Sequence, residues 1–179
     1  RLRKTSAKRR NTSWGEKMPK PLKMKASTAC RDLIKHYEDL RLVGYLCPAG
    51  YPTWGWGHTG PDVRLGGTVS KVRAEELFDI DVAEAERVVG SAVKVDLTQG
   101  QFDALVSFVF NVGPGVKGIK DGFVTLKSGR PSTMLTKINA GDFKAAAAQF
   151  DLWVMSKGQR LNGLVARRAR ERALFEQEA

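Results

Sequence analysis

Three residues in the first third of the chain carry side chains that could together cleave a glycosidic bond. Glu38 can donate a proton, Cys47 can act as a base or nucleophile once its thiol ionises, and Thr53 can hold a water molecule by hydrogen bonding. Glycosidic cleavage needs a proton donor for the leaving oxygen and a second group that activates water or attacks the anomeric carbon. The three residue types match this chemistry if the fold brings them together.

The proton donor is expected near the end of a helix. Apolar residues recur at helical spacing over residues 28–41, and Ser27 or Thr28 can cap the start of that helix. A carboxyl group at the end of a helix is partly withdrawn from water when it faces a neighbouring hairpin, and this favours its protonated form. Glu38 is therefore placed to serve as a general acid.

The other two residues are expected on a β-hairpin over residues 45–58, with a turn at Pro48-Ala49-Gly50. Pro52 is compatible with that hairpin only on an edge strand or at a bulge. Cys47 then lies on the first strand and Thr53 on the second, which allows both to face the end of the helix.

Alternation along the second strand indicates which face a sugar could approach. Thr53, Gly55 and Gly57 share one face, and Trp54 and Trp56 share the other. The face with Thr and Gly is bare enough to admit a sugar ring, so Gly55 and Gly57 are candidate substrate-binding residues. The tryptophans are expected to pack on protein, with a stacking role under a sugar as the alternative.

The remainder of the chain is predicted to be mostly helical. One amphipathic helix is expected over residues 70–89. A second begins at Thr98 with a capping box to Gln101 and stops at Gly113-Pro114-Gly115. Residues 114–131 are expected to be irregular. Further helices are expected over 132–139, 142–153 and 162–177, with Asp142 and Asn162 as caps.

This order of elements predicts an α+β fold, with a small hairpin lobe (about 42–67) beside a larger helical lobe (about 70–179). A cleft between two such lobes is a common place for a ligand site. The 179 residues suit one globular domain, which we assign to residues 28–179.

Positive charge is concentrated at the amino terminus. Residues 1–27 hold ten of the 30 Lys and Arg residues and one of the 19 acidic residues, a net +9, which leaves +2 for residues 28–179. The arm lacks a hydrophobic period, so it is expected to be flexible. It is either an incidental solvated tail or a segment that binds an anionic envelope surface.

Several classes of protein do not fit the sequence. No stretch is long and apolar enough for a transmembrane helix or a signal-peptide core. The two His and two Cys residues do not have the spacing of zinc ligands, so no metal site is expected. No glycine-rich phosphate-binding loop follows a strand pattern, so no nucleotide chemistry is expected. We therefore expect no cofactor, no nucleic-acid partner and a monomer.

The spacing of the three catalytic candidates resembles a known signature. Eight residues separate Glu38 from Cys47, and five separate Cys47 from Thr53. This spacing is similar to the catalytic pattern of the phage lysozymes of glycoside hydrolase family twenty-four, which includes the T-even phage enzyme. The resemblance extends over about residues 28–177. It is also carried by Thr53-Trp54-Gly55-Trp56-Gly57-His58-Thr59, by Gln101 to Phe108 with Asn111-Val112-Gly113, and by Gly163 to Arg168 with Glu171.

The resemblance implies a lysozyme-like fold and hydrolysis of peptidoglycan between N-acetylmuramic acid and N-acetylglucosamine. It implies that Glu38 is the general acid, that Cys47 occupies a position that is Asp or Cys in the family, and that Thr53 holds the hydrolytic water. Asn111 would touch the substrate. Arg167 or Arg168 would orient Glu38, and the sequence does not decide between them. His58 is a further orienting candidate, with a structural hydrogen-bonding role as the alternative.

Two features bear on regulation and release. No signal-anchor helix is visible, which predicts an enzyme held in the host cytoplasm and passed to the periplasm through a holin. Cys30 lies eight residues before Glu38, about 12 Å away on one helix, which exceeds the reach of a disulfide to a Cys47 beside Glu38. Two free thiols are therefore expected, with a regulatory Cys30–Cys47 bond as the alternative.

Two other functions fit part of the sequence. A lytic transglycosylase or chitinase on a related fold would also use Glu38, although a transglycosylase does not use water as acceptor. Alternatively, the basic residues 1–27 could make the chain an envelope-permeabilising protein.

Overall fold

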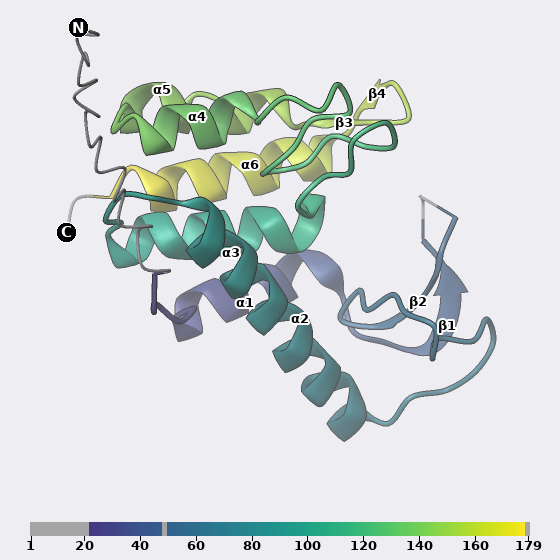
Figure 1. Cartoon of the computed structure of the whole chain (residues 1–179). Coiled ribbons are helices and arrows are strands. Elements are labelled where there is room, and N and C mark those ends of the chain that lie inside the picture. The colour runs from purple at the N-terminus through teal and green to yellow at the C-terminus, as the bar shows by residue number, and fades with distance from the viewer. Residues whose placement is uncertain (1–21, 48–49, 178–179) are drawn as a thin grey trace, which may run out of the picture.

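The computed structural model describes residues 22–47 and 50–177, and within them the chain is mainly helical. Figure 1 labels the elements. In chain order they are α1 (Thr28–Glu38), β1 (Arg41–Leu46), β2 (Pro52–Gly55), α2 (Lys71–Ala92), α3 (Gln99–Val112), α4 (Thr133–Asn139), α5 (Phe143–Ala147), a 3₁₀ helix η1 (Phe150–Leu152), β3 (Met155–Ser156), β4 (Gln159–Arg160) and α6 (Asn162–Phe175).

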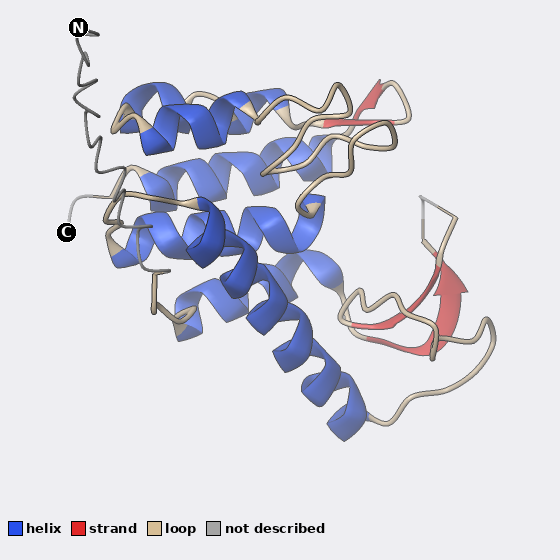
Figure 2. Ribbon diagram, viewed as in Figure 1, coloured by secondary structure: helices blue, strands red, loops and turns tan. Residues whose placement is uncertain are grey.

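The elements form two lobes, as predicted, and the fold class is α+β (Figure 2). The β1–β2 hairpin and its loops make the small lobe, and α3 to α6 make the large one. Helix α2 runs between them, and α1 ends beside the hairpin (Figure 1). None of the helices within the described residues has the length and apolar character that a membrane span requires.

Side-chain caps explain where most of the helices begin. Ser27, Ser70, Thr98, Ser132 and Asp142 each accept a hydrogen bond from a backbone N–H in the first turn of the helix that follows. Both halves of the predicted capping box between Thr98 and the third residue of α3 are present. Helix α6 is the exception, and the predicted cap at Asn162 is wrong. Leu161 holds the cap position without a side-chain hydrogen bond, and Asn162 is the first helical residue.

The β1–β2 hairpin is short and antiparallel, with Tyr45 opposite Thr53 and Leu46 opposite Pro52. Its first strand begins four residues earlier than predicted, at Arg41, and a bulge lies between Arg41 and Tyr45. The sheet has two strands, so Pro52 lies on an edge, as its missing N–H requires.

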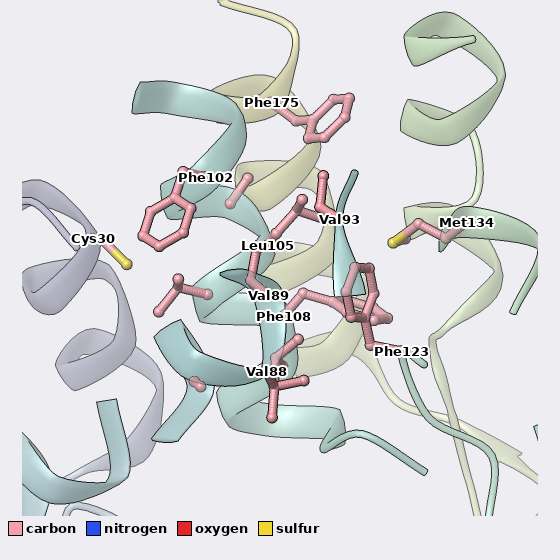
Figure 3. Packing of buried hydrophobic residues seen from close by; sticks show 14 of the residues in the cluster. Cys30, Val88, Val89, Val93, Phe102, Leu105, Phe108, Phe123, Met134 and Phe175 are labelled. Carbon is pink, nitrogen blue, oxygen red and sulfur yellow. The ribbon is translucent and has the colours of Figure 1, made fainter. Parts of the chain in front are cut away.

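Most buried side chains form one core in the large lobe, shown close up in Figure 3. Phe102, Leu105 and Phe108 of α3 lie at its centre, and Cys30 points into it from α1 (Figure 3). A second small cluster joins Val69 with Ala74 and Leu77 of α2, and Trp54 packs against it from the hairpin. Helix α2 therefore contributes to both cores, which fixes the hairpin lobe to the helical lobe.

Three predictions about the elements need correction. Residues 142–153 form α5 and the 3₁₀ helix η1 rather than one helix. The β3–β4 hairpin was not predicted, because each strand has two residues. The boundary of the basic arm at residue 27 is also wrong: Leu22, Met24 and Ala26 pack against the core, and Lys25 pairs with Glu86 at 2.6 Å. Residues 1–21 of the arm lie outside the described residues.

His58 connects the loop after β2 to α2. Its Nδ1 lies 2.8 Å from Asp81 Oδ2, and its Nε2 lies 3.3 Å from Asp62 Oδ1. The hydrogen bond to Asp81 raises the pKa of His58 above its ordinary value, against an opposing effect of burial. A raised pKa in the folded state means that protonation of His58 favours folding. This contribution is fully present below the unfolded-state value, about 6.5, and is lost as the pH rises through the folded-state pKa.

The variant Asp81→Asn should reduce this pH dependence, with Asp62 as the remaining partner of His58. We expect the difference in free energy of unfolding between wild type and Asp81→Asn, measured by urea denaturation, to be larger at acidic than at alkaline pH. Glu76→Gln serves as a control, because Glu76 forms an exposed pair with Arg73 and not with a histidine. A difference for Asp81→Asn that is as insensitive to pH as that of the control would contradict this account.

Candidate active site

A pocket of about 750 Å³ lies between the hairpin lobe and the helical lobe. All three catalytic candidates line it. The hairpin side supplies Glu38, Tyr45, Cys47, Thr53, Gly57 and Thr59, and the helical side supplies Asn111, Val112, Lys120, Asp121, Leu152, Trp153, Met155, Ser156, Leu161 and Leu164. A smaller pocket of about 200 Å³ adjoins it and shares Gly57 and Thr59. The structure therefore brings the three residues together in one pocket.

Glu38 is the last residue of α1, and its carboxyl group reaches the pocket with 18% of the side chain exposed. Arg167 Nη1 donates a hydrogen bond of 2.5 Å to Glu38 Oε1. The other oxygen, Oε2, faces Gly57: a Cβ atom at Gly57 would lie 2.9 Å from it. Arg167 thus holds one carboxyl oxygen, and the missing side chain at Gly57 leaves room beside the other.

Thr53 and Cys47 approach from the hairpin. Thr53 is buried, and its Oγ1 donates a hydrogen bond of 2.9 Å to the carbonyl oxygen of Tyr51. Because the hydroxyl proton is donated within the hairpin, the lone pairs of Oγ1 remain free to accept a hydrogen bond from water. Cys47 follows β1, and its N–H donates to the same carbonyl oxygen at 3.0 Å. Both residues are therefore fixed by the backbone of the turn.

Tyr45 is a pocket residue to which we assigned no role from the sequence. It lies opposite Thr53 in the hairpin, and Arg41 stacks on its ring at 4.4 Å. Burial raises the pKa of Tyr45, and the negative charge of Glu38 adds to this, against a lowering effect of Arg41. Its phenol consequently keeps its proton and can donate a hydrogen bond in the pocket.

A buried cluster of charged groups supports the pocket from α6. Arg167, Arg168 and Glu171 are each at most 2% exposed. Arg167 Nε donates to Glu171 Oε1 at 3.1 Å, and Arg167 Nη2 donates to the carbonyl oxygen of Ser107 at 3.3 Å. The structure thereby decides what the sequence left open, since Arg167 and not Arg168 contacts Glu38.

Arg168 supports the opposite wall. Its Nη2 donates a hydrogen bond of 2.7 Å to Asn111 Oδ1. The amide nitrogen of Asn111, at the end of α3, is left to face the pocket as a donor. This placement suits the predicted contact between Asn111 and the substrate.

Two residues that we predicted for the site lie elsewhere. Gly55 does not line the pocket. It is buried against α2, where an added Cβ atom would meet Ala74 Cβ at 3.3 Å. His58 does not contact Glu38, because both of its ring nitrogens face aspartates. The tryptophans pack on protein as expected, with Trp54 in the small core and Trp56 against the large one.

The two cysteines lie in different surroundings, and no disulfide joins them. Cys30 is fully buried on α1, and its Sγ lies 3.3 Å from the carbonyl oxygen of Asp103. Burial, aided by the negative charge of Asp103, raises the pKa of the Cys30 thiol to about 12. Cys30 is therefore an inert core residue, whereas Cys47 is partly exposed in the pocket. Within the described residues, no group of His, Cys, Asp and Glu side chains could hold a metal ion.

The helical wall contains residues that sequence reasoning missed. Leu152, Met155 and Leu161 come from η1 and the β3–β4 hairpin, and all three are exposed apolar side chains at the pocket. The signal available in the sequence was the pair Lys157-Gly158. In the structure these residues have φ angles of +48° and +78°, which suit a two-residue hairpin turn.

Comparisons with known proteins agree with this geometry. A family model described as Phage lysozyme matches residues 35–171. The chain belongs to the phage lysozyme family. The endolysin of Acyrthosiphon pisum secondary endosymbiont phage 1 is 41% identical over 148 residues, which are 80% of this chain and 92% of that relative. Among solved structures, the endolysin from Escherichia coli O157:H7 phage FAHEc1 is 31% identical with a TM-score of 0.70, over 87% of this chain and 96% of that one.

Some members of the family are longer. The endolysin of Bacillus phage B103 is 45% identical over 154 residues, which are 85% of this chain and 54% of the relative. The chain thus spans about half the length of that phage lysozyme relative.

The two neighbouring glycines allow the site to be separated from the scaffold. Both have positive φ, +61° at Gly55 and +87° at Gly57, so an alanine costs about 1–2 kcal/mol at either position. Gly57→Ala also displaces the Glu38 carboxyl group, and we expect it to lower the rate of peptidoglycan hydrolysis on the order of 10²-fold.

Gly55→Ala serves as the matched control, because its methyl group meets α2 and not Glu38. It should lower the melting temperature at least as much as Gly57→Ala while keeping a rate close to that of wild type. If Gly57→Ala and Gly55→Ala are equally stable and lose the same fraction of the rate, the space that Gly57 leaves beside Glu38 does not matter for hydrolysis. The measurements are turbidity loss of purified cell walls and thermal unfolding.

Proposed function

We propose that this chain is an endolysin that hydrolyses the β-1,4 bond between N-acetylmuramic acid and N-acetylglucosamine in bacterial peptidoglycan. The observation that carries the proposal is the meeting of Glu38, Cys47 and Thr53 in one pocket between two lobes. The phage lysozyme family supports the same reaction class. The finer assignment to glycoside hydrolase family twenty-four, with a relation to the T-even phage enzyme, stays a prediction.

The geometry suggests which oxygen of Glu38 delivers the proton. Oε1 accepts a hydrogen bond from Arg167, so Oε2 is the oxygen that can carry the acidic hydrogen. Oε2 faces the bare backbone of Gly57, which leaves space for a glycosidic oxygen to come within hydrogen-bonding distance. Protonation of that oxygen makes it a better leaving group as positive charge builds on the sugar ring.

Thr53 and Cys47 act on the water. Thr53 Oγ1 accepts a hydrogen bond from the water, because its own proton is donated to Tyr51. Cys47, as thiolate, takes the second proton of that water or stabilises the charge on the sugar ring. Asn111, held by Arg168, donates a hydrogen bond to the glycan from the opposite wall. The resemblance implied the same roles for Glu38, Thr53 and Asn111.

The substrate sets where the enzyme must act. In a Gram-negative host, peptidoglycan lies in the periplasm, so we propose the periplasm as the place of action. Passage from the host cytoplasm through a holin stays a prediction.

The test of the general acid is Glu38→Gln, which keeps the shape of the side chain and removes the proton. We expect a loss of 10²- to 10⁴-fold, roughly, in the rate of hydrolysis of purified peptidoglycan, because proton donation contributes about that much. Asp32→Asn is the matched control, since Asp32 is an exposed acidic residue on the same helix. It should keep nearly the full rate. Retained turnover in a folded Glu38→Gln enzyme would rule out this assignment.

The basic amino-terminal segment suggests an additional role in passing the outer envelope. Residues 1–27 carry a net charge of +9, which favours binding to anionic lipids and polymers. We expect a chain that begins at Leu22 to hydrolyse purified walls at the full rate and to lyse intact cells from outside less well. Residues 22–27 must be kept, because they pack on the core. Unchanged lysis of intact cells would show that the segment is incidental.

A further inference from the structure

Glu171 is a fully buried carboxylate that the proposed reaction does not yet use. It lies on α6, four residues after Arg167 and three after Arg168, so both guanidinium groups can reach it on one face of the helix. Arg167 Nε and the Ser107 hydroxyl both donate to Oε1, at 3.1 and 2.7 Å. Arg168 Nε lies 3.1 Å from Oε2 in a geometry that gives a charge contact and not a hydrogen bond.

The two arginines extend from Glu171 to opposite walls of the pocket. Arg167 reaches Glu38 at 2.5 Å, and Arg168 reaches Asn111 at 2.7 Å. Glu171 is therefore the common partner of the group that holds the proton donor and of the group that holds the substrate-facing amide. A change at Glu171 would therefore alter the positions of side chains on both walls of the pocket.

The charges in this cluster create a conflict for the general acid. A guanidinium group beside a carboxyl group favours its ionised form, whereas a proton donor must be neutral. Arg167 donates a hydrogen bond to Glu38, and Arg168 interacts with Glu38 electrostatically. Other ionisable groups near this pocket are Tyr45, Cys47, Lys120 and Asp121, which line it with Glu38, and Asp39 and Arg41, which act on Tyr45. Among the described residues on the α6 side, Glu171 supplies the negative charge that offsets the two arginines.

Glu171 is charged when it does this. Burial raises the pKa of Glu171 above its ordinary value, and Arg168, Arg167 and the Ser107 hydroxyl oppose this effect. The ionised form prevails at neutral pH, because a neutral Glu171 would leave two guanidinium groups buried without a counter-charge, which is strongly destabilising. Burial also lowers the pKa of Arg168, to about 10, so this arginine still carries its charge at neutral pH.

We propose that Glu171 is a positioning residue for glycan hydrolysis: it fixes Arg167 and Arg168, and its negative charge offsets theirs so that Glu38 keeps its proton. This inference rests on the proposed function. It differs from a purely structural role, because it predicts a change in the pH dependence of the reaction and not only in stability.

The first test is Glu171→Gln, which preserves shape and removes the charge. We expect the alkaline limb of the pH profile for peptidoglycan hydrolysis at low substrate concentration to move to lower pH by roughly one pH unit. The rate at neutral pH should fall about tenfold in consequence. Glu86→Gln is the matched control, because Glu86 is another largely buried glutamate, but it pairs with Lys25 and Ala26 at the start of α1. The Glu86→Gln variant should lose stability, but the alkaline limb of its pH profile should stay where it is in wild type.

A second variant keeps the proposal testable if Glu171→Gln does not fold. Arg168→Met removes one positive charge and fills the same space with an apolar side chain. The limb should then move to higher pH, opposite to Glu171→Gln, while a weakened hold on Asn111 raises KM. A merely structural cluster predicts no such reversal of sign.

The outcomes separate this inference from the proposed function. If wild type hydrolyses peptidoglycan and the limb of a folded Glu171→Gln enzyme coincides with that of Glu86→Gln, the inference is wrong and the function stands. The same holds if the limb of Arg168→Met fails to move to higher pH. If Glu38→Gln retains full activity, the proposed function itself fails.

Discussion

The hydrogen bond from Arg167 to Glu38 joins the last helix of the chain to the end of the first, across 129 residues of sequence. The site depends on this contact, because a glutamate at the end of a helix would otherwise sample several rotamers in solvent. The guanidinium group is almost completely buried, so it cannot move away without leaving its charge unpaired in the core. The position of the proton donor is thereby set by the packing of the helical lobe and not by local structure.

A buried arginine can perform this task only because its neighbours satisfy it. Glu171, the Ser107 carbonyl oxygen and Glu38 accept its hydrogen bonds, and its guanidinium group lies 5.5 Å from the centre of the Tyr37 ring. Breaking such a pair by removing one partner typically costs 3–5 kcal/mol, roughly. The cluster is therefore part of the core and of the site together. The hairpin lobe, by contrast, is held through α2, whose first half packs against Trp54.

The sequence predicted what depends on neighbouring residues. The caps at Ser27, Thr98 and Asp142 and the buried face of α2 follow from local chemistry and helical periodicity. The pairing of Tyr45 with Thr53 follows from the hairpin and brings Cys47 near the helix end. Those features sufficed to predict that Glu38, Cys47 and Thr53 share a site.

What the sequence could not settle depends on how the elements pack. Arg167 and Arg168 are adjacent and chemically alike, and only the rotation of α6 decides which one faces Glu38. Alternation placed Gly55 with Gly57, but the chain turns after Gly55, so one glycine packs on α2 and the other faces the acid. The β3–β4 hairpin has strands too short to show a period, yet it forms part of the pocket wall.

Hydrolysis requires that water accepts the glycosyl group when the glycosidic bond is cleaved. Digestion of purified peptidoglycan in heavy-oxygen water, followed by mass spectrometry of the fragments, shows whether it does. We expect fragments that end in N-acetylmuramic acid, with one heavy oxygen atom at each new reducing end. Fragments that end in anhydro-muramic acid, with no oxygen from the solvent, would contradict it.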